Sequence, residues 1–243
     1  MTLLVLGGTG EGRRLSEMLR AEGIDHIASL AGATRAAQAQ TGLVRVGGFG
    51  GEDGFRRFLD EAGITAVLDA THPFAAQISE RTARVATALG LPHLMLLRPA
   101  WAPKKGDLWT EIADEAEARE FVQPGQVVFL ATGRQTLDRF ANLTEARLIC
   151  RQIDPPDGPF PFANGRFEVG RPPFSVEHEI ELFTRLGVDW LITKNAGGRL
   201  AEPKLVAARQ MGLPVMMIRR PEPPLCARVE TVEDAMGWAR ALA

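Results

Sequence analysis

The sequence of 243 residues contains no tyrosine, which excludes the Tyr–Lys chemistry of short-chain dehydrogenases. It contains only two cysteines, Cys150 and Cys226, which form neither a CxxC pair nor a metal-ligand spacing. We therefore expect reduced thiols, a cytoplasmic location and no metal site. No apolar run approaches the ~20 residues that a membrane span needs. The segment Met1–Leu6 has no basic residue, so we expect neither a signal peptide nor a membrane partner.

The sequence also lacks an excess of basic charge. It has 28 Lys plus Arg against 30 Asp plus Glu, a formal net charge of −2, which argues against nucleic acid as a general partner. Hydrophobic residues make up 45% and charged residues 24%, the balance of a globular protein. The length allows one large domain or two of ordinary size.

The chain contains two similar halves, because three landmarks recur in the same order. The matched segments are Leu3–Gly10 with Val127–Arg134, Gly63–Asp69 with Gly187–Thr193, and Gly90–Pro99 with Gly212–Pro221. In each half, 62 positions separate the first landmark from the second, from Leu6 to Leu68 and from Leu130 to Ile192. Each half then ends in an acidic, alanine-rich helical pattern, at 114–122 and 232–242. The alternative is that any β/α alternation produces such similarity.

We predict an α/β fold with two similar Rossmann-like domains, each with a parallel sheet, and a cleft between them. The first domain, 1–122, would bind NADP, and the second, 123–243, would form the substrate side of the cleft. Ligands of open parallel sheets bind beyond the carboxyl ends of the strands. The candidate functional residues are therefore those that directly follow the predicted strands.

The first such loop is the glycine-rich segment after Leu6, whose members are Gly7, Gly8, Thr9, Gly10, Glu11 and Gly12. Glycines let the backbone approach a phosphate closely, and a helix that starts near Glu11 directs N–H groups and a positive dipole end at that anion. The spacing departs from GxGxxG because Arg13 stands where the third glycine belongs. The alternative is a simple strand-to-helix turn.

The end of the second predicted strand, 24–30, indicates which nucleotide is bound. A site for NAD usually has an acidic residue there, which binds the ribose 2′-hydroxyl. Here Ser29 and Arg35 provide a hydroxyl and a guanidinium, which suit a 2′-phosphate, so NADP(H) is the expected cofactor. Arg35 could instead be a solvated residue at a helix start. A third strand, 43–46, leads into Gly47–Gly54, with five glycines in eight residues, which we expect to face a ligand rather than to be a plain flexible connection.

The segment Asp69–Ala75 follows the fourth predicted strand. We expect Thr71 or His72 to cap a helix in which Pro73 is the first residue. His72 would also lie at the mouth of the cleft, where it can donate to a carboxamide or carboxylate. Thr71 and His72 are therefore candidate cofactor-binding residues, and His72 is also a candidate catalytic residue.

Cations gather at the predicted strand ends of the second half, which suits an anionic ligand. The candidate substrate-binding residues are Arg134, Lys194, Asn195, Lys204 and Arg220, and Lys194 is also a candidate catalytic residue. The alternative is that each is a solvated surface residue. The proline-rich segment 151–173 is expected to be neither helix nor strand but a long loop that faces the substrate, followed by a helix capped by Ser175.

These segments together resemble the precorrin-6A reductases of corrin (vitamin B12) biosynthesis, over essentially the whole chain. The segments that carry the resemblance are Leu6–Gly12, Gly47–Gly54, Asp69–Ala75, Thr132–Arg134, Lys194–Gly198 and Glu202–Lys204. The usual Ser-Gly-Gly after Lys-Asn appears here with Ala196 in place of the serine, which argues against a hydroxyl role at that position.

The resemblance implies an NADPH-dependent reduction of one macrocycle double bond of precorrin-6A, with hydride to C19 and a proton to C18, giving precorrin-6B. The cations would bind the acetate and propionate carboxylates of this tetrapyrrole substrate. Neighbouring enzymes of the same pathway are the candidate protein partners.

Two other functions remain open from the residues alone. A non-catalytic NADP-binding regulatory protein would not need the cations of the second half. A tetrapyrrole methyltransferase that uses S-adenosylmethionine also needs a glycine loop, but its cofactor's ribose usually takes a carboxylate after the second strand, and none is present. Binding of NADPH or of S-adenosylmethionine distinguishes these possibilities.

Overall fold

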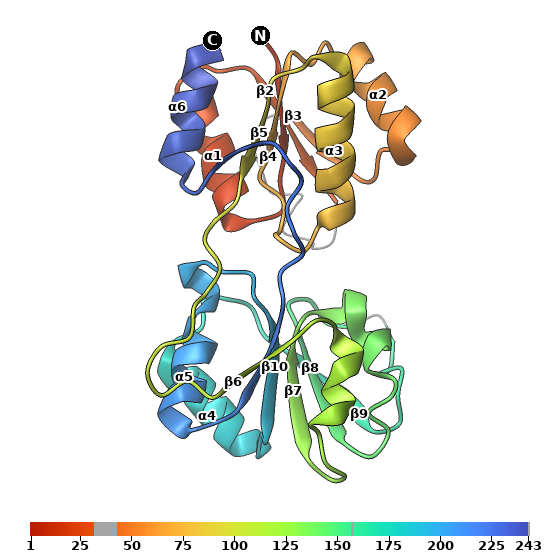
Figure 1. Ribbon diagram of the computed structural model, residues 1–243, viewed down its shortest axis with the longest axis vertical. Coiled ribbons are helices and arrows are strands. Elements are labelled where there is room, and N and C mark those ends of the chain that lie inside the picture. The colour runs from red at the N-terminus through yellow and green to blue at the C-terminus, as the bar shows by residue number, and fades with distance from the viewer. Residues whose placement is uncertain (32–42, 157, 243) are drawn as a thin grey trace. The chain divides into compact units, whose positions relative to one another are not determined.

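The computed structural model describes residues 1–31, 43–156 and 158–242 of the chain (Figure 1). The expectations for Arg35 therefore lie outside the described residues. The chain forms two compact units, the first made of Met1–Pro99 with Pro221–Ala243 and the second of Ala100–Arg220. Each unit is an α/β domain with a parallel sheet of six strands, which confirms the predicted fold class.

The sheet of the first unit has the strand order β12-β5-β4-β1-β2-β3. The strands are β1 (Leu3–Leu6), β2 (His26–Leu30), β3 (Leu43–Val46), β4 (Ala66–Asp69), β5 (His93–Leu96) and β12 (Ala227–Val229). Among the described residues, it is covered by α1 (Gly10–Ala21), α2 (Gly51–Glu61), α3 (Ala76–Leu89) and α6 (Val232–Leu242). Figure 1 shows α1 and α6 on one face of this sheet and α2 and α3 on the other.

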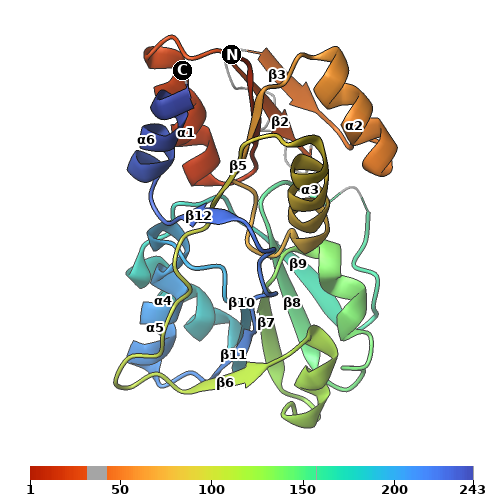
Figure 2. The same ribbon diagram turned by 45° about the horizontal axis from the view of Figure 1, so that its top comes forward.

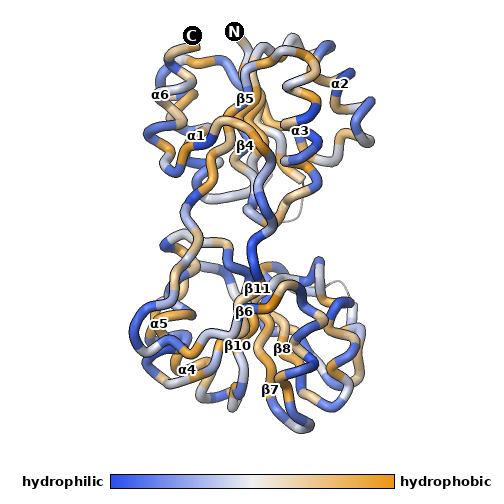
Figure 3. Tube along the Cα trace, in the orientation of Figure 1, coloured by the Kyte–Doolittle hydropathy of each residue, from blue (hydrophilic) through white to orange (hydrophobic). Residues whose placement is uncertain are grey.

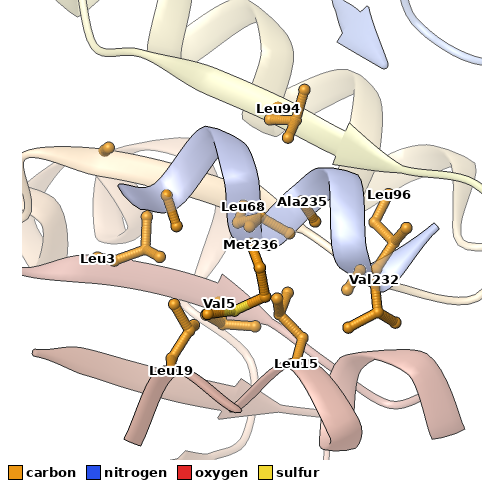
Figure 4. Packing of buried hydrophobic residues seen from close by; sticks show 13 residues of the cluster. Leu3, Val5, Leu15, Leu19, Leu68, Leu94, Leu96, Val232, Ala235 and Met236 are labelled. Atoms are coloured by element: carbon orange, nitrogen blue, oxygen red, sulfur yellow. The ribbon is translucent and has the colours of Figure 1, made fainter. Parts of the chain in front are cut away.

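Both faces of this sheet are buried, so its central strands are apolar throughout rather than alternating, as Figure 3 shows by colour. Successive strand residues point to opposite faces. Leu3 and Val5 pack with Leu15, Leu19 and Met236 under α1 and α6 (Figure 4). Leu4 and Leu6 belong to a second cluster, with residues of α2 and α3. The strand ends are therefore held rigidly from both sides.

The sheet of the second unit has the order β6-β11-β10-β7-β8-β9. Its strands are β6 (Trp109–Ile112), β7 (Val127–Ala131), β8 (Arg147–Gln152), β9 (Gly165–Val169), β10 (Trp190–Lys194) and β11 (Val215–Ile218). Its helices are α4 (Val176–Leu186), α5 (Pro203–Met211) and the 3₁₀ helices η2 (Glu115–Glu120), η3 (Arg134–Phe140) and η4 (Arg199–Ala201). The core under α4 and α5 includes Phe129 and Phe183, whose ring centroids are 5.1 Å apart.

The expected boundary between 122 and 123 is corrected by the pairing of the edge strands. After β5 the chain enters the second unit, where β6 pairs with β11, as Figure 2 shows, and η2 follows. After β11 it returns to the first unit, where β12 pairs with β5 and α6 packs on α1. Each half thus places its last strand and helix on the other unit's sheet. The sequence repeat is compatible with either arrangement, because an edge strand can add to either of two similar parallel sheets.

The proline-rich segment also differs from expectation, because it contains strand residues at its start and again inside it. β8 continues to Gln152, and β9 occupies 165–169, a stretch without proline whose Phe167 and Val169 favour a strand. The prolines lie before β9, at 155–161, and after it, at 172 and 173. The Ser175 cap is confirmed, since its hydroxyl accepts a hydrogen bond of 3.1 Å from the N–H of His178.

Among the described residues, none of the helices combines the length and the apolar character that crossing a membrane requires.

Candidate active site

The glycine loop after β1 leads directly into helix α1, and Thr9 is the N-cap of that helix. The Thr9 hydroxyl accepts from the N–H of Gly12 at 3.0 Å and donates to the carbonyl of Ala70 at 2.8 Å, which ties the helix start to the end of β4. A Cβ at Gly12 would lie 3.3 Å from that of Ala70, a tight contact that favours glycine. Gly8 has a φ of 120°, and a Cβ there would meet nothing within 4 Å. The backbone at Gly8 is therefore open, as a phosphate-binding loop requires.

Glu11, at the start of α1, forms an ion pair with Arg98, which follows β5. The distance from Arg98 Nη1 to Glu11 Oε2 is 2.6 Å, and the Arg98 side chain is only 16% exposed. A free carboxylate in this first turn would repel a bound phosphate. The ion pair neutralises that carboxylate, so the positive end of the α1 dipole remains able to attract an anion.

Beside the end of β2 lies an arginine that the sequence reasoning did not single out. Ser29 is buried and pairs in register with Arg45 of β3. The Arg45 guanidinium donates to the carbonyls of Gly47 and Gly48, both at 2.6 Å, and its carbon lies 3.9 Å from the centroid of the Phe49 ring. Arg45 therefore fixes the start of the glycine-rich loop. Side chains alternate between the two faces of a strand, and this alternation along 43–46 could have indicated that Arg45 lies on the same face of the sheet as Ser29.

The glycine-rich loop itself is shorter than expected, because α2 begins at Gly51. Gly54 lies inside the helix, where an added Cβ would overlap the carbonyl of Phe49. Gly54 is thus required for packing rather than for mobility. The loop before the helix is therefore limited to 47–50.

The end of β4 carries Asp69, which is fully buried. Its Oδ1 accepts from the backbone N–H of Thr71 at 3.0 Å and from the Thr71 hydroxyl at 2.6 Å. His72 is exposed, and its Nδ1 accepts from the N–H of Phe74 at 3.2 Å. This turn occupies the residues expected to start the helix.

The expected cap at Thr71 or His72 is therefore wrong. α3 begins at Ala76 after Ala75, without a side-chain cap, and Pro73 lies in the turn. The physical reason is that the Thr71 hydroxyl is bound to Asp69, and the His72 ring to the turn itself. His72 is thereby placed at the carboxyl end of the sheet on a defined backbone.

Lys194 is the last residue of β10, and its side chain is largely buried. Its Nζ donates to the carbonyl of Thr132, after β7, at 3.3 Å and lies 3.8 Å from Oε1 of Glu115. Burial lowers the pKa of Lys194, and the Glu115 carboxylate opposes this effect. Arg134, the first residue of η3, is exposed at the end of the neighbouring strand β7. The structure thus brings these two predicted cations to adjacent strand ends.

Asn195 and Lys204 contact the chain segment that enters the second unit. The Asn195 side chain binds both backbone groups of Trp101, and the indole N–H donates to the carbonyl of Gly198 at 3.2 Å. The Lys204 Nζ lies 5.0 Å from the Trp101 ring centroid and donates to the carbonyl of Ala201 at 2.7 Å. Arg220 donates from Nε to the Asn195 carbonyl at 3.1 Å. These three predicted ligands therefore fix the loop after β10.

A groove of about 420 Å³ lies beside β9 and the start of α4, in part of the segment expected to face the substrate. Three arginines line it, and each is paired with a carboxylate. The pairs are Arg151 with Glu179, Arg171 with Asp154 and Arg185 with Glu168. Each of these cations has its own carboxylate, whereas beside the end of β10 the single carboxylate of Glu115 faces both Lys194 and Arg139, so the groove is the weaker candidate for an anion site.

Comparison with known proteins agrees with these features. The family model described as "Precorrin-6x reductase CbiJ/CobK" matches residues 2–240. The precorrin-6A reductase of Rhodococcus erythropolis is 42% identical over 99% of this chain and 98% of its own, and that of Rhodobacter capsulatus is 41% identical over 97% and 94%. The solved structure of a CobK precorrin-6A reductase superposes with a TM-score of 0.93 at 40% identity, covering 99% of this chain and 97% of that one. The chain belongs to the precorrin-6x reductase family.

Proposed function

We propose that this protein reduces one double bond of the precorrin-6A macrocycle to give precorrin-6B, with NADPH as the reductant, in cobalamin biosynthesis. The observation that carries the proposal is the open backbone at Gly8 directly before the capped helix α1, in a chain that matches the reductase family from residue 2 to 240. The free cysteines, Cys150 and Cys226, fit the reducing cytoplasm in which we place the protein.

The first unit offers the groups that a dinucleotide phosphate needs. The N–H groups at Gly10 and Glu11 begin α1, while that of Gly12 is bound by the Thr9 hydroxyl, and the Arg98 ion pair removes the repulsion of the Glu11 carboxylate. We assign cofactor binding to this turn, Gly8–Gly12, with Ser29, Arg35, Thr71 and His72. The strand end at Ser29 lacks the carboxylate of an NAD site, which supports NADPH over NADH.

When bound, NADPH supplies the hydride, which we assign to C19 of the macrocycle, and a proton is added at C18. The residues of this chain act by binding and orientation, since a near-attack arrangement supplies much of the rate of such a transfer. His72 lies after the end of β4, where its ring can donate a hydrogen bond to a polar group of the cofactor or the substrate. We keep His72 as a candidate catalytic residue on this basis.

We assign the carboxylates of the substrate to the second unit, with Lys194 and Arg134 as their direct partners. Lys194 is the better placed to orient the macrocycle, because its ammonium group is held between Thr132 and Glu115. For Asn195, Lys204 and Arg220, the contacts described above support an indirect role, in which they keep the loop after Lys194 in place.

The proposal is tested by mixing the purified protein anaerobically with precorrin-6A and NADPH and following cofactor oxidation and product mass. Stoichiometric formation of precorrin-6B supports it. Tight NADPH binding without any turnover would instead indicate a regulatory protein, and binding of S-adenosylmethionine with methyl transfer would indicate a methyltransferase. Parallel reactions with the cobalt-containing substrate show which form is preferred.

A further inference from the structure

Glu115 is a buried carboxylate that no sequence pattern singled out. It is the first residue of η2, which begins shortly after β6, and only 3% of its side chain is exposed. Its Oε1 lies 3.8 Å from Lys194 Nζ, and its Oε2 lies 3.3 Å from Nη1 of Arg139. Acidic side chains are almost never fully buried without a partner, so these two cations explain how the carboxylate is tolerated there.

The fold alone gives little reason to bury this charge. Removing a carboxylate from water costs several kcal/mol, and apolar residues of similar volume often replace buried ion pairs without loss of stability. Arg139 is 62% exposed, so water would solvate it equally well without Glu115. Lys194 differs, because it is largely buried at the carboxyl end of β10, where a substrate is expected. The burial of the Glu115 carboxylate is therefore explained by its interaction with Lys194 rather than by a gain in stability.

Charged and titratable groups act on Lys194 from three surrounding elements. They are Glu115 on η2, Arg139 on η3 and Cys150 on β8. Burial raises the pKa of the Cys150 thiol to about 11, so this group is neutral at physiological pH. Arg139 disfavours a charge on Lys194. Among these groups of the described chain, Glu115 alone supplies negative charge near neutrality.

We propose that Glu115 is a positioning residue, which holds the Lys194 ammonium charged and directed at the substrate carboxylates. This inference rests on the proposed function, in which Lys194 contacts the substrate. It also gives a role to the exchange of edge strands, because β6 brings Glu115 from the first half of the sequence to Lys194 in the second.

The test compares Glu115→Gln, which keeps the volume, with Glu115→Asp, which keeps the charge. The matched control is Glu111→Gln, which removes an exposed carboxylate of β6 that pairs with Arg219. Lys194 is charged below its pKa, and loss of the Glu115 charge lowers that pKa. The alkaline loss of kcat/KM should therefore begin at lower pH in Glu115→Gln. At neutral pH we expect the KM for precorrin-6A to rise about tenfold, the usual effect of losing one charged contact.

Glu115→Asp should recover part of this loss, and Glu111→Gln should behave as the wild type. The NADPH dissociation constant should stay close to wild type in all three variants, and the melting temperature should fall only in Glu115→Gln, where the buried Lys194 charge loses the Glu115 carboxylate. A wild-type pH profile and KM in Glu115→Gln would overturn the inference. So would parallel losses of stability and NADPH binding, which would indicate a structural role.

A second measurement does not depend on turnover. The Lys194 amine is titrated by NMR in protein with ¹³C-labelled lysine, with its signal assigned through Lys194→Arg. A lower pKa in Glu115→Gln than in the wild type supports the inference, and equal pKa values overturn it. A protein that shows the NMR shift but never oxidises NADPH contradicts the proposed function and leaves the Glu115–Lys194 coupling intact.

Discussion

The side-chain amide of Asn195 forms two hydrogen bonds with the backbone of a single residue, Trp101. Its Oδ1 accepts from the Trp101 N–H at 2.8 Å, and its Nδ2 donates to the Trp101 carbonyl at 3.0 Å. Two consecutive residues of one motif thus have different tasks. Lys194 presents a charge at the strand end, and Asn195 fixes the chain where it enters the second unit.

Asn195→Ala should lower the free energy of unfolding by about 1–3 kcal/mol, because the two backbone groups of Trp101 lose their partners. Urea unfolding measures this loss. Asn142→Ala, which removes one exposed hydrogen bond to Ala116, is the control and should cost less. An Asn195→Ala protein of normal stability with a strongly raised KM would show that Asn195 binds the substrate directly.

Gly8→Ala should weaken NADPH binding. Its φ of 120° is a conformation that other residues rarely adopt, and forcing it costs about 1–3 kcal/mol, although the added methyl group meets no atom within 4 Å. Either strain or a shifted loop displaces the N–H groups from the phosphate. Titration of NADPH by fluorescence measures the effect. Gly237→Ala, on the exposed side of α6, should leave the affinity unchanged. Equal NADPH affinities in both variants would show that Gly8 is not part of the cofactor site.

Arg35→Ala and Arg45→Ala should affect the two nicotinamide cofactors differently. If Arg35 binds the 2′-phosphate, its loss weakens the binding of NADPH by about a few kcal/mol at most and leaves the binding of NADH nearly unchanged. Arg45 holds the carbonyls of Gly47 and Gly48, so its loss should weaken both cofactors. Calorimetric titration of each variant with NADPH and NADH distinguishes these patterns. If Arg45→Ala loses affinity for NADPH but not for NADH, and Arg35→Ala does not, then Arg45 rather than Arg35 binds the 2′-phosphate.

The fragment 100–220 should fold on its own, because it contains all six strands of its sheet. A fragment 123–243 should not, since it lacks β6 and carries β12 and α6 without the sheet on which they pack. Circular dichroism and the cooperativity of urea unfolding provide the comparison. Cooperative unfolding of 123–243 with native-like ellipticity would contradict the exchange of edge strands.

Local patterns predicted the central parallel strands and the glycine loops of this fold, because apolar runs and turn residues act over a few positions, but they missed β9, which was expected to be loop. The exchange of β6 and β12 could not be read in this way. It depends on which of two similar sheet edges each strand meets, and the sequence of the strand is compatible with both. The cap expected at Thr71 was wrong for a related reason, since the bond from Asp69 competes for the same hydroxyl.

The turn from β1 into α1 at Gly8, Thr9 and Gly12 has the geometry that its sequence pattern indicated. The binding of a cofactor by these residues stays a prediction. The Asn195 amide donates and accepts in the same way whether it binds a ligand or the backbone of Trp101. The residue type alone therefore could not show which of the two partners it has. Glu115 was missed because a glutamate in an acidic, alanine-rich stretch resembles a solvated residue, and its burial arises only when β6 joins the other sheet.

Transfer of deuterium from the cofactor tests the central claim most directly. The protein is incubated with precorrin-6A and NADPH that carries deuterium at the transferable position of nicotinamide C4, and the product is analysed by NMR. The account predicts precorrin-6B with deuterium at C19. In a second reaction, with unlabelled NADPH in deuterated solvent, it predicts deuterium at C18. A product without deuterium from the cofactor, or NADPH oxidation without reduction of the macrocycle, would contradict it.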